Sequence, residues 1–206
     1  MAGTSKIELP KINIEVIDIK LVGDTPLIVH AWSEKAKKEM LDKQTKAAKP
    51  GKEAKDPERD FHQALYQIKG GGYGFPSVAF KAAAVTACTS VDGITKVAAR
   101  QAFHVLGKQV EYKGAFQGVL MRQDLVLIEG SEPRIREDMV RIGQGTADLR
   151  YRPEFWPWFV TIQVKFNANT LSKAQIINLF NTAGFGVGIG EWRPERDGNS
   201  GTFHVE

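Results

Sequence analysis

Cysteine is nearly absent from this sequence, whose 206 residues include only Cys88. A single thiol excludes an internal disulfide and is typical of a reducing, cytoplasmic environment. Cys88 lies in the apolar segment AAAVTACTSV. Because free cysteine is among the most buried residue types, we expect this thiol to lie in the core and to take no part in catalysis.

Long apolar runs are also absent. No segment approaches the roughly 18 consecutive apolar residues of a membrane span. The first residues, MAGTSKIELPK, lack the apolar stretch of a signal peptide. The excess charge is small, since 28 Lys and Arg residues against 24 Asp and Glu residues leave +4. We expect no membrane association, and the charge permits an acidic partner without requiring one.

Catalytic motifs are missing too. The sequence has no Gly-x-Ser-x-Gly, no Walker loop, no His-Glu-x-x-His and no Cys-x-x-Cys. The four histidines are scattered along the chain: His30, His62, His104 and His204. The sequence therefore predicts no catalytic residue, no metal and no cofactor.

Hydrophobic periodicity predicts the fold. The segment from Ile12 to Leu21 alternates apolar and polar residues, as a half-buried strand does. The residues expected to share its buried surface are Ile12, Ile14, Val16, Ile19 and Leu21. Helices are predicted over 77–91, 96–103 and 171–185, a loop over 70–76, and strands over 115–122, 124–130, 157–167 and 202–205. Ser172 is the expected cap of the last helix, whose apolar face would consist of Ile176, Ile177, Leu179 and Phe180.

This order predicts an α+β fold of the ferredoxin-like (RRM-like) kind, with helices on one face of an antiparallel sheet. We expect a single domain over 1–206. A lysine-rich helical insertion at about 33–70 interrupts it, with Ser33 as the cap of a first helix and Phe61, Leu65 and Ile68 on one face of a second. The lysine side chains there predict a solvated surface.

The stretch GFGVGIGEWR near the end of the chain is unusually rich in glycine. These glycines follow a predicted helix rather than a strand, so they do not form a dinucleotide-binding loop. One interpretation is a helix C-cap at Gly184 followed by a tight turn. The other is a loop that lets a nucleic-acid backbone or a neighbouring subunit approach closely. Trp192 is either a core anchor, which we favour, or a stacking platform.

A second stretch, EPRIREDMVRIGQGTADLRYRPEFW (132–156), carries arginine and no lysine. The segment Ile142-Gly143-Gln144-Gly145-Thr146 predicts a hairpin tip. Arginine forks suit bidentate phosphate contacts, and arginines near aromatic residues suit single-stranded nucleic acid. The alternative is an ordinary surface hairpin whose arginines are balanced by Glu137, Asp138 and Asp148.

Three segments resemble the RAMP superfamily, the ferredoxin-like proteins that include backbone subunits of CRISPR effector complexes. They are Thr25–His30, Gly74–Ala83 and the tail from Gly184 to Phe203. The whole chain also resembles a group of small phage-encoded proteins. The resemblance implies a subunit that binds single-stranded RNA or DNA along its backbone and that oligomerises, with a thumb-like hairpin at 131–156. It implies a location in the cytoplasm of a bacterial host.

The residues that we expect to bind nucleic acid are Lys81, Arg100, Arg134, Arg136, Arg141, Arg150, Arg152, Gly186, Gly188, Trp192 and Arg193. Two other functions remain open at this point. One is a structural or assembly protein of a phage, with the hairpin as a subunit clasp. The other is a metal-independent ribonuclease.

Overall fold

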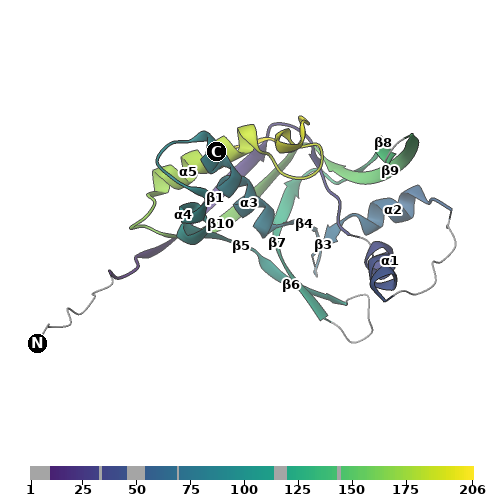
Figure 1. The fold of residues 1–206 in the computed structure, drawn as a ribbon, viewed down its shortest axis with the longest axis horizontal. Coiled ribbons are helices and arrows are strands. Elements are labelled where there is room, and N and C mark those ends of the chain that lie inside the picture. Colours follow the sequence, from purple (N-terminus) through teal and green to yellow (C-terminus); the bar gives the residue numbers. More distant parts are fainter. Residues whose placement is uncertain (1–9, 33, 46–53, 69, 114–119, 143–144) are drawn as a thin grey trace, which may run out of the picture.

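The computed structural model describes residues 10–32, 34–45, 54–68, 70–113, 120–142 and 145–206. It is an α+β fold built on an antiparallel sheet (Figure 1). The central strands are β1 (Ile14–Gly23), β10 (Trp158–Asn167), β5 (Phe103–Leu106) and β11 (Phe203–Val205). They lie in the order β11-β1-β10-β5, every pair antiparallel. This is the order of a ferredoxin-like sheet, as predicted.

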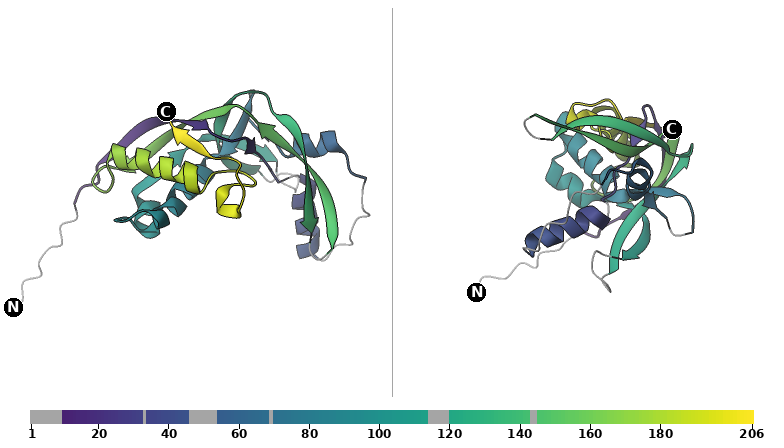
Figure 2. Two further views of the ribbon diagram at one scale, coloured as in Figure 1. Left: turned by 90° about the horizontal axis from the view of Figure 1, so that it is seen from above. Right: turned by 90° about the vertical axis from the view of Figure 1, so that its right-hand side faces the viewer.

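Helices α3 (Ser77–Ala87), α4 (Lys96–Ala102) and α5 (Lys173–Gly186) cover one face of this sheet (Figures 1 and 2). The 3₁₀ turns η1 (Cys88–Ser90) and η2 (Pro194–Arg196) follow α3 and precede β11. The core between helices and sheet is rich in aromatic side chains, and the largest fully buried ones are Trp158, Phe80, Phe103, Phe155, Phe166, Phe180 and Phe203. Cys88 is buried, as predicted, and burial raises the pKa of its thiol.

One prediction for β1 is wrong. Ile19 and Leu21 are buried, but Ile12, Ile14 and Val16 are exposed. Ile14 and Val16 lie opposite Asn167 and Lys165 of β10, on the sheet face that the helices do not cover. Because side chains of a strand alternate between faces, only the set that includes Ile19 reaches the core.

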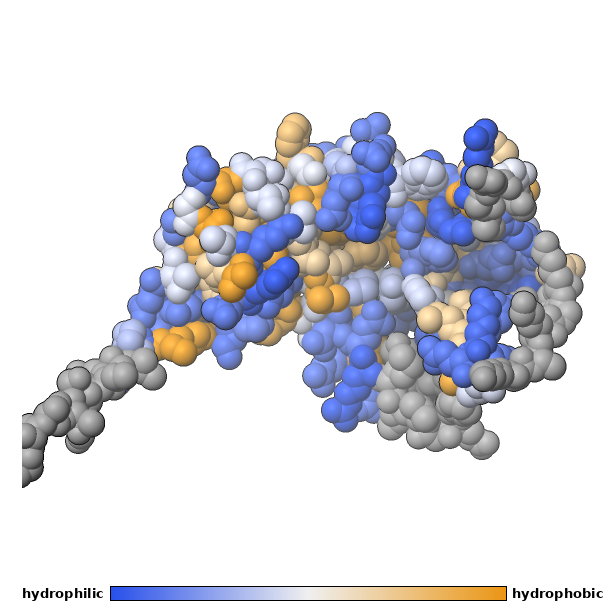
Figure 3. All heavy atoms as spheres, in the orientation of Figure 1, coloured by the Kyte–Doolittle hydropathy of each residue, from blue (hydrophilic) through white to orange (hydrophobic). Residues whose placement is uncertain are grey.

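Among the described residues, four further strands lie between β5 and β10 in the sequence. Strand β6 (Lys108–Lys113) continues β5 but pairs with β7 (Leu120–Gly130), and β7 also pairs with β4 (Tyr73–Pro76). The β6–β7 arm is mainly hydrophilic at its surface, whereas the surface over α3 to α5 mixes polar and apolar residues (Figure 3). Strand β4 occupies the segment that we expected to be a loop, and the two strands predicted at 115–122 and 124–130 are described as one strand from residue 120.

The inserted segment lies between β1 and α3. It contains β2 (Leu27–Ile28), α1 (Glu34–Gln44), α2 (Pro57–Gln63) and β3 (Tyr66–Gln67). Asp56 caps α2, and its carboxylate accepts a hydrogen bond from the Arg59 amide. The prediction that Leu65 and Ile68 share a helix face with Phe61 is wrong, because α2 ends at Gln63; both side chains are nevertheless buried. Ser33, the predicted cap of α1, lies outside the described residues.

Strands β8 (Arg134–Ile142) and β9 (Thr146–Phe155) form the predicted hairpin, and β9 also pairs with β2. Ile142 and Thr146 pair at its tip, as predicted, while residues 143 and 144 lie outside the described ranges. The hairpin projects from the sheet and contacts α2 through β9 (Figure 1).

Helix α5 begins at the predicted cap, Ser172, where a capping box with Gln175 satisfies both amides. Its buried side chains include Ile176, Leu179 and Phe180, but Ile177 is exposed, contrary to our prediction. Gly184 is not the C-cap either, because the helix continues to Gly186 and Val187 follows as the cap. A Cβ at Gly184 would overlap the carbonyl oxygen of Phe203, so glycine is needed there for α5 to pack against β11.

We expect Gly184→Ala to lower the free energy of unfolding by about 1–3 kcal/mol, since the added methyl forces helix and strand apart. The matched control is Gly186→Ala in the same helix, where a Cβ meets no atom within 4 Å. The control should be neutral or stabilise by up to about 1 kcal/mol, because alanine is the better helix former. Urea denaturation measures both, and a Gly184→Ala protein as stable as wild type would contradict the packing described here.

Candidate nucleic-acid interface

The β8–β9 hairpin has two chemically different faces, which follow from its register. Residues that lie directly opposite each other in an antiparallel pair share a face. Arg134 lies opposite Glu154, Arg136 opposite Arg152, and Asp138 opposite Arg150. We call this side, which four of the five predicted arginines share, the charged face.

The other face is mainly apolar. It carries Ile135, Met139 and Leu149, which are 43%, 73% and 42% exposed. Arg141 lies on this face near the tip. We call this side the apolar face. A hydrogen bond to Glu137 raises the pKa of Tyr151, which lies opposite it on the same face.

Acidic side chains neutralise most of the charged face. Arg136 donates to Glu154 at 2.6 Å and to Asp138 at 2.9 Å, and the bond to Glu154 is the main reason that its pKa is raised. Arg150 lies 3.9 Å from Asp148, which also pairs with Lys55 of the insertion. These contacts favour a balanced surface hairpin for Arg136 and Arg150.

Arg134 and Arg141 differ from the other hairpin arginines. Both are exposed, and the guanidinium of neither makes an ion pair or hydrogen bond with any residue that the structure describes. They lie at opposite ends of β8, one on each face. Of the predicted hairpin residues, these two present their guanidinium groups most directly to a ligand.

Arg152 is buried, with only 3% of its side chain exposed. Its guanidinium lies 3.5 Å from Asp138 and 3.9 Å from Glu191 of the C-terminal tail, and its Nε has no hydrogen-bond partner among the residues that the structure describes. Burial keeps Arg152 from direct contact with a strand of nucleic acid. It instead connects the base of the hairpin to the tail.

Glu191 is the acceptor that completes this connection. One of its oxygens lies 3.6 Å from Nδ1 of His30. The interaction with His30, followed by the charges of Arg152 and Arg150, lowers the pKa of the Glu191 carboxyl, while partial burial opposes this shift. At neutral pH Glu191 is therefore a carboxylate held between a histidine and a buried guanidinium.

The glycine-rich tail packs against its own chain. Gly188 has a φ of +67°, and a Cβ there would meet Pro194 Cδ at 2.8 Å. The amides of Glu191 and Gly201 donate to the carbonyls of Ile28 and Pro26, at 3.0 and 2.8 Å. The close approach predicted at Gly188 is therefore made by this protein itself, whereas Gly186 faces open space at the end of α5.

Trp192 is not a core residue, contrary to the interpretation that we favoured. Its side chain is 43% exposed and its φ is +56°. Non-glycine residues rarely adopt this conformation, which concentrates at binding and switch sites. Its neighbour Arg193 donates to the Gly190 carbonyl at 3.0 Å and to Glu195 at 2.7 Å, so this guanidinium braces the tail.

The three segments that carry the resemblance meet at one cavity of about 330 Å³. His30 comes from the first, Pro76 and Ala79 from the second, and Gly188 and Arg193 from the third. A second cavity, of about 450 Å³, adjoins it at His30 and lies between the hairpin and the insertion. Arg150 and Arg152 line this second cavity. The fold thus joins the glycine tail to the hairpin through His30.

Lys81 and Arg100 lie apart from these cavities. Lys81 of α3 contacts His104 Nδ1 at 3.2 Å, and burial lowers the pKa of the lysine. Burial, together with the charges of Lys81 and Lys165, lowers the pKa of His104. Arg100 is exposed on α4. The predicted binding residues therefore form two groups, one around the hairpin and tail and one beside β5.

Within the described ranges, no group of three or more His, Cys, Asp or Glu residues is arranged to hold a metal ion. No described helix combines the length and apolar composition that crossing a membrane requires.

No family of known proteins matches the chain, and no curated protein matches it.

Glu191 gives this site a pH dependence. Because its pKa is lowered on folding, its stabilising effect is present above its ordinary value near 4.5 and is lost as pH falls through the folded value. We expect the urea midpoint of wild type to fall more between pH 6 and pH 3 than that of Glu191→Gln. Asp197→Asn, in the same tail, is the control and should follow wild type. Parallel curves for Glu191→Gln and wild type would show that the carboxylate adds no stability.

Proposed function

We propose that this protein binds single-stranded RNA or DNA without reading its sequence and without cleaving it, as a RAMP-like, phage-encoded subunit in the cytoplasm of a bacterial host. The observation that supports this most is the meeting of the three RAMP-like segments at a cavity next to the arginine hairpin. Three segments that resembled the family only by chance would have no reason to lie together in the fold.

The exposed arginines supply the phosphate contacts in this proposal. Arg134 and Arg141 lie at the two ends of β8 and on opposite faces, so a strand that contacts both passes around the hairpin from the charged face to the apolar face. Trp192, exposed beside the cavity-lining residues Glu191 and Arg193, offers a face on which a base can stack. The ion-paired arginines hold the hairpin in shape.

The apolar face supports oligomerisation. Met139 and Leu149 lie opposite each other and are exposed, and Ile135 lies on the same side beyond Glu137. Contiguous exposed apolar side chains mark protein interfaces when the patch is large enough. A second copy of this chain is the partner that we propose for it.

The same face favours one other function, in which the hairpin is a subunit clasp of a structural phage protein that binds no nucleic acid. The neutralised charged face agrees with this second candidate. The two candidates differ in whether the exposed arginines contact phosphates.

Replacing Arg134 and Arg141 together by Ala should weaken binding to a labelled single-stranded oligonucleotide. The slope of log affinity against log salt should become shallower by about 1.4, since each phosphate contact on a single strand contributes about 0.7. Fluorescence anisotropy over a salt series measures this. The control is Lys11→Ala with Lys173→Ala, which removes the same charge near the opposite end of the sheet, just before β1 and at the first residue of α5. Equal slopes in both double variants would mean that the hairpin makes no specific phosphate contacts, and a wild type that binds at no salt concentration supports the clasp.

Met139→Glu should dissociate the oligomer, because a carboxylate at the centre of the apolar face opposes burial against a second copy. Light scattering at several protein concentrations measures the mass. The control is Phe185→Glu on α5, where an equally apolar side chain is 85% exposed. A monomeric wild type, or dissociation by both substitutions alike, would argue against assembly through the hairpin.

A further inference from the structure

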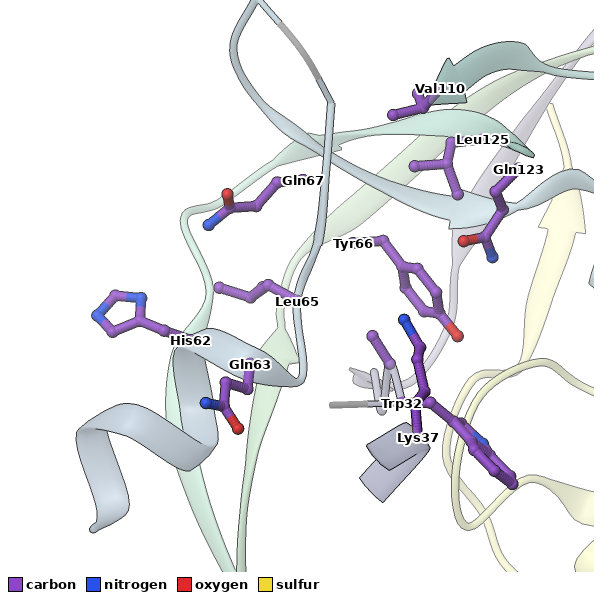
Figure 4. A pocket seen from close by; sticks show the side chains of 11 residues that line it. Trp32, Lys37, His62, Gln63, Leu65, Tyr66, Gln67, Val110, Gln123 and Leu125 are labelled. Atoms are coloured by element: carbon purple, nitrogen blue, oxygen red, sulfur yellow. The ribbon is translucent and has the colours of Figure 1, made fainter. Parts of the chain in front are cut away.

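A third cavity, of about 520 Å³, lies where the insertion meets the β6–β7 arm. It contains none of the residues that we predicted as binding residues. Its lining comes from the segment after β2, from α1, from the end of α2 with β3, and from β6 and β7. Its volume is within the range of small-molecule sites. Figure 4 shows its side chains.

The floor of the cavity is apolar and closely packed. Leu65, Val110 and Leu125 are 6%, 9% and 3% exposed. Val110 and Leu125 belong to a small cluster with Ile68, against which Tyr66 packs. The Tyr66 ring also contacts Phe75 edge to face, with centroids 6.1 Å apart. The contacts with Phe75 and with this cluster therefore fix the position of the Tyr66 ring.

The walls carry aromatic rings, amides and one lysine. Trp32 is 57% exposed, and the chain before it is held because the Ala31 amide donates to the Ala64 carbonyl at 2.8 Å. In Figure 4 the Tyr66 ring lies between the amide of Gln123 and the ammonium of Lys37, with the Trp32 indole beyond the lysine. The remaining polar walls come from His62, Gln63 and Gln67.

Carboxylates distinguish the three cavities. The cavity at the glycine tail is lined by Glu191 and Glu195, and the one at the hairpin by Glu39, Asp60 and Asp148. Among its described lining residues, the third cavity has no Asp or Glu. Its described lining thus combines ring faces, hydrogen-bond donors and acceptors and positive charge, and includes no carboxylate.

We propose that this cavity binds one nucleotide unit: a nitrogen heterocycle that carries a phosphate. The base stacks on Trp32 and Tyr66, because every base presents a π face to an aromatic ring. The amide of Gln123 donates to and accepts from the edge of the base, and an amide can serve any base in this way. The ammonium of Lys37 pairs with the phosphate.

The unit can come from two sources, a free mononucleotide or one residue of a bound strand, and the second rests on the proposed function. Calorimetric titration with AMP and UMP tests the cavity alone. Ribose 5-phosphate lacks the base, and adenosine lacks the phosphate. We expect both to bind at least about 10-fold more weakly than AMP. A six-residue oligouridylate tests the strand.

Trp32→Ala should lower the affinity for the ligand that occupies the cavity by about 5- to 100-fold, the range expected for loss of one stacking partner. Gln123→Leu keeps the size of the side chain, removes the amide and should also weaken binding. Phe185→Ala removes an exposed aromatic ring from α5, outside all three cavities, and should bind like wild type. Circular dichroism confirms that each variant is folded.

The outcomes separate the two sources. Weaker binding of AMP and UMP by Trp32→Ala supports the cavity whatever the oligonucleotide does. If Trp32→Ala weakens binding of the hexanucleotide but not of AMP or UMP, the bound nucleotide unit is part of a strand. Suppose that the hexanucleotide binds with the expected salt dependence, but Trp32→Ala and Gln123→Leu leave the affinity for every ligand unchanged. The cavity proposal is then overturned and the proposed function stands. If wild type binds mononucleotides but no oligonucleotide, the proposed function fails and the cavity stands. If it binds neither, both fail.

Discussion

The buried guanidinium of Arg152 connects the β8–β9 hairpin to the C-terminal tail. Removing a charge from water costs several kcal/mol unless partners compensate it, and removal of one partner of such a group costs about 3–5 kcal/mol. The compensation comes from Asp138 in the facing strand and from Glu191 in the tail. Because these carboxylates belong to distant segments, the hairpin and the tail must both be in place before the charge is balanced.

The topology of the fold could be predicted from the sequence better than the details of burial. The segment around β1 contains two apolar sets of opposite parity, one with Ile14 and Val16 and the other with Ile19 and Leu21. The sequence does not say which set the helices will cover. The sequence did not predict strands β5 and β6, because Gly107 interrupts their pattern. In the structure the chain changes its pairing partner at this glycine, from β10 to β7. Glycine inside a strand often marks a bend or a close backbone approach, and a Cβ at Gly107 would meet the Asp124 backbone at 2.9 Å.

The candidate site was located by composition, but its chemistry depends on register. The sequence indicates an arginine-rich hairpin and a glycine-rich tail, and both exist. It does not indicate that Arg136 and Arg152 lie among carboxylates while Arg134 and Arg141 stay exposed, because these differences arise from cross-strand pairs and from the tail. His30 and Glu191 were overlooked as site residues for the same reason. Trp32 and Gln123 carry no local motif, and only the fold brings them to one cavity.

The register of the hairpin also limits how its length can change. Successive residues of a strand point to opposite faces, so parity alone separates the charged face from the apolar face. An insertion of one residue near the base of either strand would exchange the two faces beyond that point and turn Met139 towards the side that Asp138 now occupies. Insertions of two residues preserve the separation. Among relatives or engineered variants, hairpins of this kind can therefore lengthen or shorten in even steps, while an odd step requires a bulge to restore the alternation.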